Sequence, residues 1–304
     1  MSLVLRQETL HLGLRDPFRI ARSDHGAGHR VTTVIVELRD DRLPGLVGVG
    51  EGYPDRFYGE TPATMAAVMP VLLEQAESLI ADFGDTAATR QALEGLAETW
   101  AGTIRGHGAA KCALDIALHD LAGRALGLPV HELLGLSADL PPTDFTIGID
   151  APEVVAERAR RASAFPALKI KVGGPGDVAT LEAVRAVFDG PIRVDANTAW
   201  TPDDAVAILP DLVRLGVELI EQPFPARRML ERARELGLRT FLGCMEETSV
   251  GIAGSAIVAS LAEWVDLDGC LLLADDPFEG LELGPDHRWQ LAARPGLGLS
   301  RRAS

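Results

Sequence analysis

Three short segments of the sequence place charged side chains where an apolar stretch ends. They are Lys169-Ile-Lys171, Asp195-Ala-Asn197 and Glu221-Gln-Pro223, and they lie roughly 25 residues apart. Each closes a run of residues that suits a buried strand. Lysines and carboxylates brought together in this way predict a lysine base that faces a divalent cation.

The two carboxylates end consecutive predicted strands, so Asp195 and Glu221 are expected to be neighbours across a sheet. Without a cation, two converging carboxylates repel and raise each other's pKa. A hard divalent cation such as Mg²⁺ removes this conflict and prefers oxygen ligands. A plainer alternative stays open, in which these are ordinary strand-end carboxylates that cap helices or pair with arginines.

Lys169 and Lys171 are two residues apart, so on a strand they point to the same face. Two lysines in a site of low dielectric lower each other's pKa, and a lysine with a lowered pKa can act as a general base. Such a base beside a metal suits removal of a proton α to a carboxylate, because the metal stabilises the enediolate. The alternative is a solvated edge strand, although the flanking Ala167-Leu168 and Val172-Gly173 favour burial.

Further acidic residues follow two later strands. Asp266-Leu-Asp268 is a second same-face pair that could hold a substrate ammonium through charge-assisted hydrogen bonds, or could simply cap a strand end. Glu246 and Glu247 follow the strand that ends at Met245. They could line the same mouth, whereas in isolation they would more often be solvated.

The elements that must position these residues fall into two parts. Residues 1–60 favour strands and residues 61–137 favour helices, which predicts an α+β module. From Thr143 onward, short apolar strands alternate with helices at steps of 24, 26, 22 and 23 residues. The predicted strands are Phe145–Ile149, Leu168–Val172, Ile192–Ala196, Glu218–Ile220, Thr240–Gly243 and Trp264–Leu267. This period predicts βα units in a barrel of the TIM type, whose active sites lie at the carboxyl ends of the strands.

The barrel is short for its type. A complete one takes about 250 residues and at least about 200, whereas Thr143 to Leu283 spans 141. We therefore expect about six βα units. The predicted domains are an N-terminal α+β capping domain over residues 1–125, a (β/α) barrel over 126–284 that is internally truncated near 226–229, and a segment over 285–304 that returns to the capping domain.

Composition limits the other partners. The net charge of −15 and the pI of about 4.9 argue against nucleic acid and against an anionic membrane surface. No apolar stretch approaches the roughly 20 residues of a membrane span, and the first residues do not resemble a signal peptide. Cys112, Cys244 and Cys270 are isolated, which favours reduced thiols and a cytoplasmic location.

Taken together, these motifs resemble the enolase superfamily in its muconate-lactonizing-enzyme-like branch. The KxK, DxN and ExP motifs at the second, third and fourth predicted strand ends match that branch. Ala113–Arg124 resembles the helix that joins its capping domain to its barrel. Leu242–Ser249 and Val265–Gly269 resemble the dipeptide epimerases of the L-Ala-D/L-Glu epimerase type, and Leu271–Gly280 continues that likeness.

The resemblance implies a role for each position. Lys171 would be the acid/base lysine, and Lys169 would help to hold its pKa and the substrate carboxylate. Asp195 and Glu221 would bind Mg²⁺. The implied substrate-binding residues are Asp266 and Asp268 for the α-ammonium of a dipeptide such as L-Ala-L-Glu, Asn197 as polar support, Glu247 at the mouth, and Arg22 or Arg19 in the specificity loop Arg19–Arg30.

The sequence also departs from the family. There, strand five bears a third metal carboxylate and strand six a second lysine on the opposite face of the α-carbon. Here Glu221–Pro225 runs almost directly into Leu230–Leu238, which resembles the helix before strand seven. Units five and six are thus expected to be absent, and those two groups have no counterpart.

Three functions stay open: a Mg²⁺-dependent dipeptide epimerase, a non-catalytic remnant or binding protein of the same fold, and a one-base dehydratase or cycloisomerase of the superfamily. A homo-oligomer is also open, since barrels of this family often associate.

Overall fold

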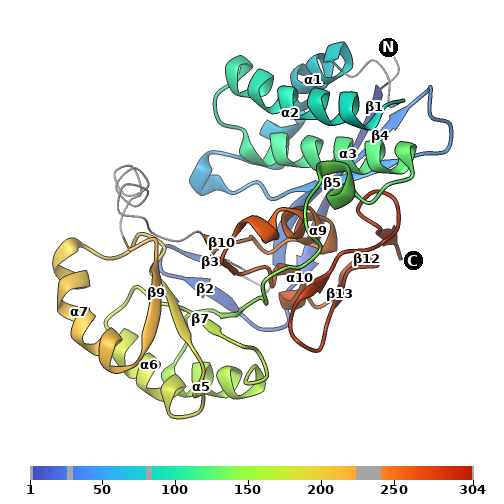
Figure 1. The fold of residues 1–304 in the computed structure, drawn as a ribbon. Helices are drawn as coiled ribbons and strands as arrows, with labels where there is room; N and C mark the ends of the chain where they lie inside the picture. Colours follow the sequence, from blue (N-terminus) through green and yellow to red (C-terminus); the bar gives the residue numbers. More distant parts are fainter. Residues whose placement is uncertain (1–2, 26–29, 80–83, 224–240, 303–304) are drawn as a thin grey trace.

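A computed structural model describes residues 3–25, 30–79, 84–223 and 241–302 of the chain. A helical layer and its sheet form one end of the molecule, and a parallel sheet with its own helices forms the other (Figure 1). The predicted junction near 226–229 and the predicted helix over 230–238 lie outside the described residues, as do positions 26–29 of the specificity loop.

The N-terminal sheet is antiparallel, with strand order β1-β4-β5. Its strands are β1 (Leu3–Gly13), β4 (Arg30–Asp40) and β5 (Gly48–Gly52). A hairpin of β2 (Phe18–Ile20) and β3 (Ser23–His25) extends from this sheet towards the parallel one (Figure 1). The β-branched run in β4 suits the buried middle of a sheet.

Three helices cover this sheet: α1 (Pro62–Leu79), α2 (Thr86–Thr103) and α3 (Gly108–Leu126). Helix α3 lies directly on the alternate glycines of β5. A Cβ at Gly50 would lie 2.0 Å from the Ala113 carbonyl oxygen, and one at Gly48 would lie 2.1 Å from that of Ala117. The glycine-rich stretch is therefore a strand whose lack of side chains permits close helix packing.

The parallel sheet has the order β6-β7-β8-β9. Helices cross between its strands, and their apolar faces pack on those strands in one core with Leu168, Ile170 and Val194. The elements are β6 (Phe145–Ile147), α5 (Pro152–Arg161), β7 (Leu168–Lys171), α6 (Asp177–Arg185), β8 (Ile192–Asp195), α7 (Pro202–Arg214) and β9 (Val217–Glu221). The predicted repeat of βα units is confirmed here.

Two further parallel strands, β10 (Phe241–Leu242) and β11 (Trp264–Val265), form their own pair. An isolated parallel bridge between Thr143 and Val265 joins β11 to the start of β6. The wall therefore runs in the order β10-β11-β6-β7-β8-β9. Within the described parts of the chain, β9 and β10 do not pair, so the six predicted strands form there a wall that is open between β9 and β10.

The C-terminal part packs back on the N-terminal domain. The Leu297 amide donates to Asp120 Oδ1 on α3 at 2.7 Å, and the Arg301 guanidinium pairs with Glu8 of β1 at 2.7 Å. The remaining elements are η1 (Arg56–Tyr58), α4 (Val130–Leu134), α9 (Ser249–Ile257), η3 (Ala259–Leu261), α10 (Gly269–Leu272), β12 (Phe278–Glu279), β13 (Glu282–Leu283), β14 (Trp289–Gln290) and β15 (Ser300–Arg301). None of the helices in the described ranges is long and apolar enough to cross a membrane.

Candidate active site

The strand register aligns three of the predicted site residues. Lys171 of β7 is the register partner of Asp195 on β8, and Asp195 is the partner of Glu221 on β9. The last residues of three neighbouring parallel strands thus form one charged row. The local reason is the period of the βα units, which brings successive strands to the same edge of the sheet.

Lys169 is buried, with only 3% of its surface exposed. Its Nζ lies 2.7 Å from Asp266 Oδ2, 2.8 Å from Glu221 Oε2 and 3.7 Å from Asp195 Oδ2. It therefore joins carboxylates from both ends of the open wall.

These contacts determine the pKa of Lys169. Burial alone would lower it, but the charges of Asp266, Glu221 and Asp195 outweigh burial and raise the pKa well above its ordinary value. The expected lowering by the neighbouring lysine is therefore wrong for Lys169, because three carboxylates surround its ammonium group.

Lys171 pairs with Asp195, whose Oδ2 accepts from Nζ at 2.7 Å. The Asn197 amide N–H donates to Asp195 Oδ1 at 2.8 Å, and its side-chain amide donates to Oδ2 at 3.1 Å. Burial would raise the pKa of Asp195, but the charges of Lys171 and Lys169 outweigh it and lower the pKa. Asp195 is therefore held ionised and fixed in position.

Asp195 and Glu221 both approach one cation, the ammonium of Lys169, and their oxygens are the type of ligand that a hard divalent cation prefers. Burial raises the pKa of Glu221 despite the Lys169 charge. Residues 3–25, 30–79, 84–223 and 241–302 contain no group of three or more acidic, histidine or cysteine side chains that could hold a metal. Two carboxylates are still a usual protein contribution to a Mg²⁺ site, where water or substrate completes the shell.

The acidic pair after β11 is held by β6. The Thr146 hydroxyl donates to Asp266 at 2.9 Å, and the Thr146 amide donates to Asp268 Oδ2 at 2.6 Å. Burial and the Asp266 charge raise the pKa of Asp268 well above its ordinary value. Burial also acts on Asp266, but the Lys169 charge outweighs it and lowers the pKa. Asp266 therefore ionises more readily than Asp268.

Many of the predicted site residues line one cavity of about 60 Å³. The β2–β3 hairpin closes one side of it and supplies Arg22, whose Nη1 donates to the Asn197 carbonyl at 3.2 Å. The predicted site residues that line the cavity are Arg22, Lys171, Asn197, Asp266 and Asp268. Lys169, Asp195 and Glu221 are outside the lining, and Asp195 connects them to it through its ion pair with Lys171.

Glu246 and Glu247 occupy different surroundings. Glu246 lines the cavity, whereas Glu247 does not. Burial and the charge of Glu51, on β5, raise the pKa of Glu247 to about 8. The structure therefore does not bring Glu247 into the cavity, and its role at the mouth stays a prediction. The guanidinium of Arg19 is not part of the lining either, although the Arg19 carbonyl accepts from the Ile149 amide at 2.8 Å.

Sequence reasoning missed Thr146, which contacts both carboxyls of the acidic pair. One signal was available: Thr146 is the polar residue inside the apolar strand Phe145–Ile147, and alternation puts it on the face opposite its two neighbours. What it contacts could not be read from the sequence, because Asp266 and Asp268 lie more than a hundred residues further along.

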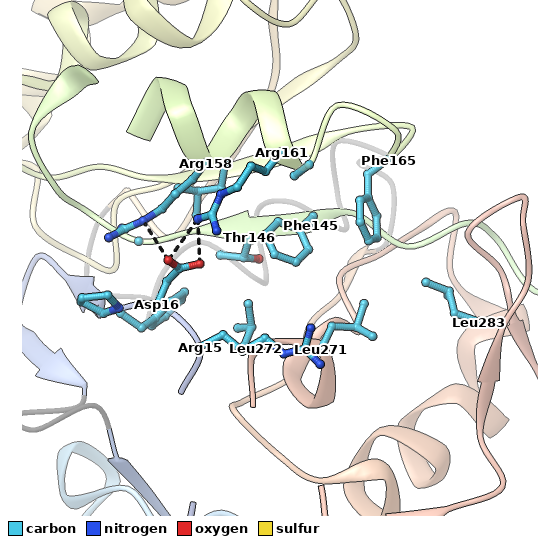
Figure 2. A pocket seen from close by; sticks show the side chains of 15 residues that line it. Arg15, Asp16, Phe145, Thr146, Arg158, Arg161, Phe165, Leu271, Leu272 and Leu283 are labelled. Atoms are coloured by element: carbon cyan, nitrogen blue, oxygen red, sulfur yellow. Dashed lines mark hydrogen bonds and ion pairs between the residues drawn. The ribbon is translucent and has the colours of Figure 1, made fainter. Parts of the chain in front are cut away.

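A larger cavity of about 340 Å³ shares Phe18, Thr146 and Leu272 with the first. Figure 2 shows Arg158 and Arg161 directed at Asp16, while Phe145 and Phe165 supply apolar walls of the cavity. A guanidinium nitrogen of Arg158 lies 3.8 Å from an Asp16 carboxylate oxygen, and one of Arg161 lies 2.9 Å from the other. Lys171, Asp266 and Asp268 do not line it. The smaller cavity is therefore the candidate active site.

Comparison with known families and proteins agrees with the fold described above. Residues 6–135 match the model of the mandelate racemase / muconate lactonizing enzyme N-terminal domain, and residues 153–270 match the enolase C-terminal domain-like model. The chain is similar to the L-Ala-D/L-Glu epimerase of Bacteroides thetaiotaomicron, with 31% identity over 346 residues, 95% of this chain and 86% of that protein. Because this chain has only 304 residues, that alignment contains positions without a counterpart here, as a shortened barrel predicts.

Other relatives lead to the same family. The L-Ala-D/L-amino acid epimerase of Pedosphaera parvula is 32% identical, over 91% of this chain and 93% of that protein. The dipeptide epimerase of Enterococcus faecalis, solved with Mg and L-Leu-L-Tyr, has a TM-score of 0.81 at 27% identity and covers 99% of this chain and 100% of its own. The Methylococcus capsulatus dipeptide epimerase with Mg and L-Arg-D-Lys has a TM-score of 0.79 at 29% identity, covering 98% and 99%. The chain belongs to the enolase superfamily, in its mandelate racemase and muconate lactonizing enzyme branch.

Proposed function

We propose that this protein is a Mg²⁺-dependent dipeptide epimerase in which Lys171 removes the α-proton of a dipeptide residue. One observation carries the proposal: Lys171 and the pair Asp266 and Asp268 line the same small cavity. A base and a site for an ammonium group thereby face the same cavity. The family and its dipeptide epimerase relatives support this substrate class.

The dipeptide is oriented by charge. Its α-ammonium would be bound by Asp266 and Asp268, which are 3% and 2% exposed and already fixed by Thr146. An ammonium group held by buried carboxylates forms strong charge-assisted hydrogen bonds. Arg22, on the hairpin side, suits an acidic side chain of the substrate, as in L-Ala-L-Glu.

Asp195 and Glu221 would hold Mg²⁺. When bound, the ion offsets the negative charge that develops on the substrate carboxylate as the α-proton leaves. Lys169 supplies positive charge to the same two carboxylates and so supports their close approach.

Lys171 accepts the proton at Nζ, and only its neutral amine can do so. Its ammonium form is held by Asp195 at 2.7 Å, which fixes the direction of the side chain for the transfer. The hairpin residues Phe18 and Ile20 close the cavity over it and limit the access of water.

A binding protein of the same fold is the second candidate. It is favoured by the contact between Lys169 and Asp266 at 2.7 Å, because that contact competes with a substrate ammonium for the same oxygen. Such a protein would retain affinity for a dipeptide without turnover.

Incubation with Mg²⁺ and L-Ala-L-Glu in D₂O, followed by NMR, separates the two candidates. We expect deuterium at the α-carbon of the C-terminal residue and formation of L-Ala-D-Glu. Lys171→Met should abolish exchange, while Lys111→Met is the matched control on α3 of the capping domain. Absence of exchange with acidic, apolar and basic dipeptides, together with calorimetry that shows dipeptide binding, would contradict the enzyme and support the binding protein.

A further inference from the structure

Inversion at an α-carbon needs a second group that transfers a proton on the face opposite the first. Lys171 serves one face in the proposed function. Apart from it, the titratable side chains in the cavity lining are Arg22, Cys244, Glu246, Asp266 and Asp268. An epimerase runs in both directions, so the second group must be able to give a proton and to take one.

Most of these groups fail that requirement. Asp266 and Asp268 are occupied by Thr146 and, for Asp266, by Lys169. The Arg22 guanidinium stays protonated in proteins. Burial and the charge of Asp268 raise the pKa of the Cys244 thiol well above its ordinary value, which disfavours the thiolate that would take a proton.

Glu246 remains, and its surroundings are unusual. Its side chain is buried, with 6% of the residue exposed, yet Oε2 has no hydrogen-bond partner in the described parts of the chain. A buried carboxyl oxygen without a partner is costly, so it calls for a functional explanation. Burial and the Glu246 charge raise the pKa of the neighbouring Tyr53, whose hydroxyl stays protonated and donates to Glu246.

Glu246 and Lys171 also enter the cavity from different parts of the wall. Glu246 follows β10 and Lys171 ends β7, and the strand order β10-β11-β6-β7 places β11 and β6 between them. Both residues line the cavity, so they reach a molecule bound there from two strands that are not neighbours. The acidic pair Asp266 and Asp268 follows β11, which lies between β10 and β7 in that order.

We propose that Glu246 is the second acid/base residue and exchanges a proton with the face of the α-carbon opposite Lys171. The proposal rests on the proposed epimerase function. In one direction, the Cα–H bond breaks, its proton passes to Lys171 Nζ and its electron pair stays on the substrate. The Glu246 carboxyl then gives its proton to the other face, and a new Cα–H bond forms. Proton exchange with water then returns Glu246 and Lys171 to their starting forms.

The test compares both diastereomers, L-Ala-L-Glu and L-Ala-D-Glu, in D₂O with Mg²⁺. The wild-type protein should exchange and interconvert both. Glu246→Gln should lose interconversion by about 10²- to 10⁴-fold, the usual contribution of a general acid or base. It should still exchange the α-proton of one diastereomer and fail with the other. Lys171→Met should give the opposite selectivity, and a purely structural defect would slow both diastereomers alike.

Glu279→Gln on β12 is the matched control, since its side chain is 55% exposed and outside the cavity. Glu246→Asp covers the case in which the glutamine variant does not fold, which circular dichroism would reveal. It should slow exchange of the diastereomer that Glu246 serves and leave the other unchanged.

The possible failures differ from each other. Interconversion by Glu246→Gln at the wild-type rate, or equal slowing of both diastereomers by Glu246→Asp, would overturn the role of Glu246 alone. Exchange without inversion in the wild-type protein would overturn it too, while proton removal by Lys171 would stand. Wild-type protein that exchanges neither diastereomer nor any other dipeptide would overturn the proposed function and this inference together.

Discussion

The two ends of the open wall hold their charged residues by different means. In β6–β9, the backbone register alone lines up Lys171, Asp195 and Glu221 on neighbouring strands. The β10–β11 pair has only two residues in each strand, and its acidic residues are held by the hydroxyl and the amide of Thr146, from a distant segment. Thr146 holds Asp266 and Asp268, and the Thr143 hydroxyl accepts from the Leu267 amide at 2.9 Å.

This difference shows how a shortened barrel can keep a site. Lys169 joins the two ends, since it contacts Glu221 on β9 and Asp266 after β11. The row in β6–β9 should therefore tolerate loss of single contacts in the β10–β11 region, while that region should depend on long-range hydrogen bonds.

The largest effect is expected from Asp195→Asn, which removes the central charge of the row. Both lysines lose a partner in a buried position, so the free energy of unfolding should fall by about 3 kcal/mol, at the lower end for a broken buried pair. Deuterium exchange at the substrate α-carbon should also be lost. Urea unfolding and NMR measure the two effects. A variant with wild-type stability would contradict the view that the Asp195 charge holds the row in β6–β9 together.

Magnesium should stabilise the β6–β9 end specifically. At a concentration 100-fold above its dissociation constant, a ligand of the folded state adds about 2.7 kcal/mol. Thermal unfolding with and without Mg²⁺ should therefore show a higher Tm with the ion, and EDTA should reverse the shift. Glu221→Gln should reduce the shift, whereas Glu279→Gln should retain it. An equal shift in both variants would argue against a site at Asp195 and Glu221.

Thr146→Val tests the other end. The valine keeps the backbone amide that donates to Asp268 but removes the hydroxyl that donates to Asp266. Loss of a hydrogen bond to a charged group typically lowers the free energy of unfolding by about 1.5–3 kcal/mol. We expect about 1.5 kcal/mol here, because Lys169 still holds Asp266. KM for the dipeptide should rise more than kcat falls, and unchanged KM would refute binding of the ammonium at this pair.

The smallest effect is expected from Glu247→Gln and concerns pH. Burial raises the pKa of Glu247 to about 8 from 4.5, so the folded state favours the protonated form. The stability that this provides is complete below about pH 4.5 and is lost as pH rises towards 8. The variant should therefore gain stability relative to wild type over that window, by roughly 1 kcal/mol because neighbouring carboxyls share the titration. The urea unfolding midpoints of the variant and of the wild type are compared at pH 5 and at pH 8. A difference between the two proteins that is the same at both pH values would contradict the prediction.

Much of the fold could be predicted because it repeats. Strand ends at a period near 24 residues indicated βα units, and the same-face spacing of Lys169 and Lys171 indicated which residues meet. The short count of strands also indicated an incomplete barrel. The behaviour of Lys169 could not be predicted, because its pKa depends on Asp266, which lies 97 residues away in the chain.

The sequence by itself determined the family, the order of the strands and the charged row, since these depend on local periodicity and on residue types at strand ends. Only the tertiary structure decided that Glu246 enters the cavity while Glu247 lies near Glu51, and that Thr146 holds the acidic pair. Burial and protonation depend on neighbours that only folding brings together.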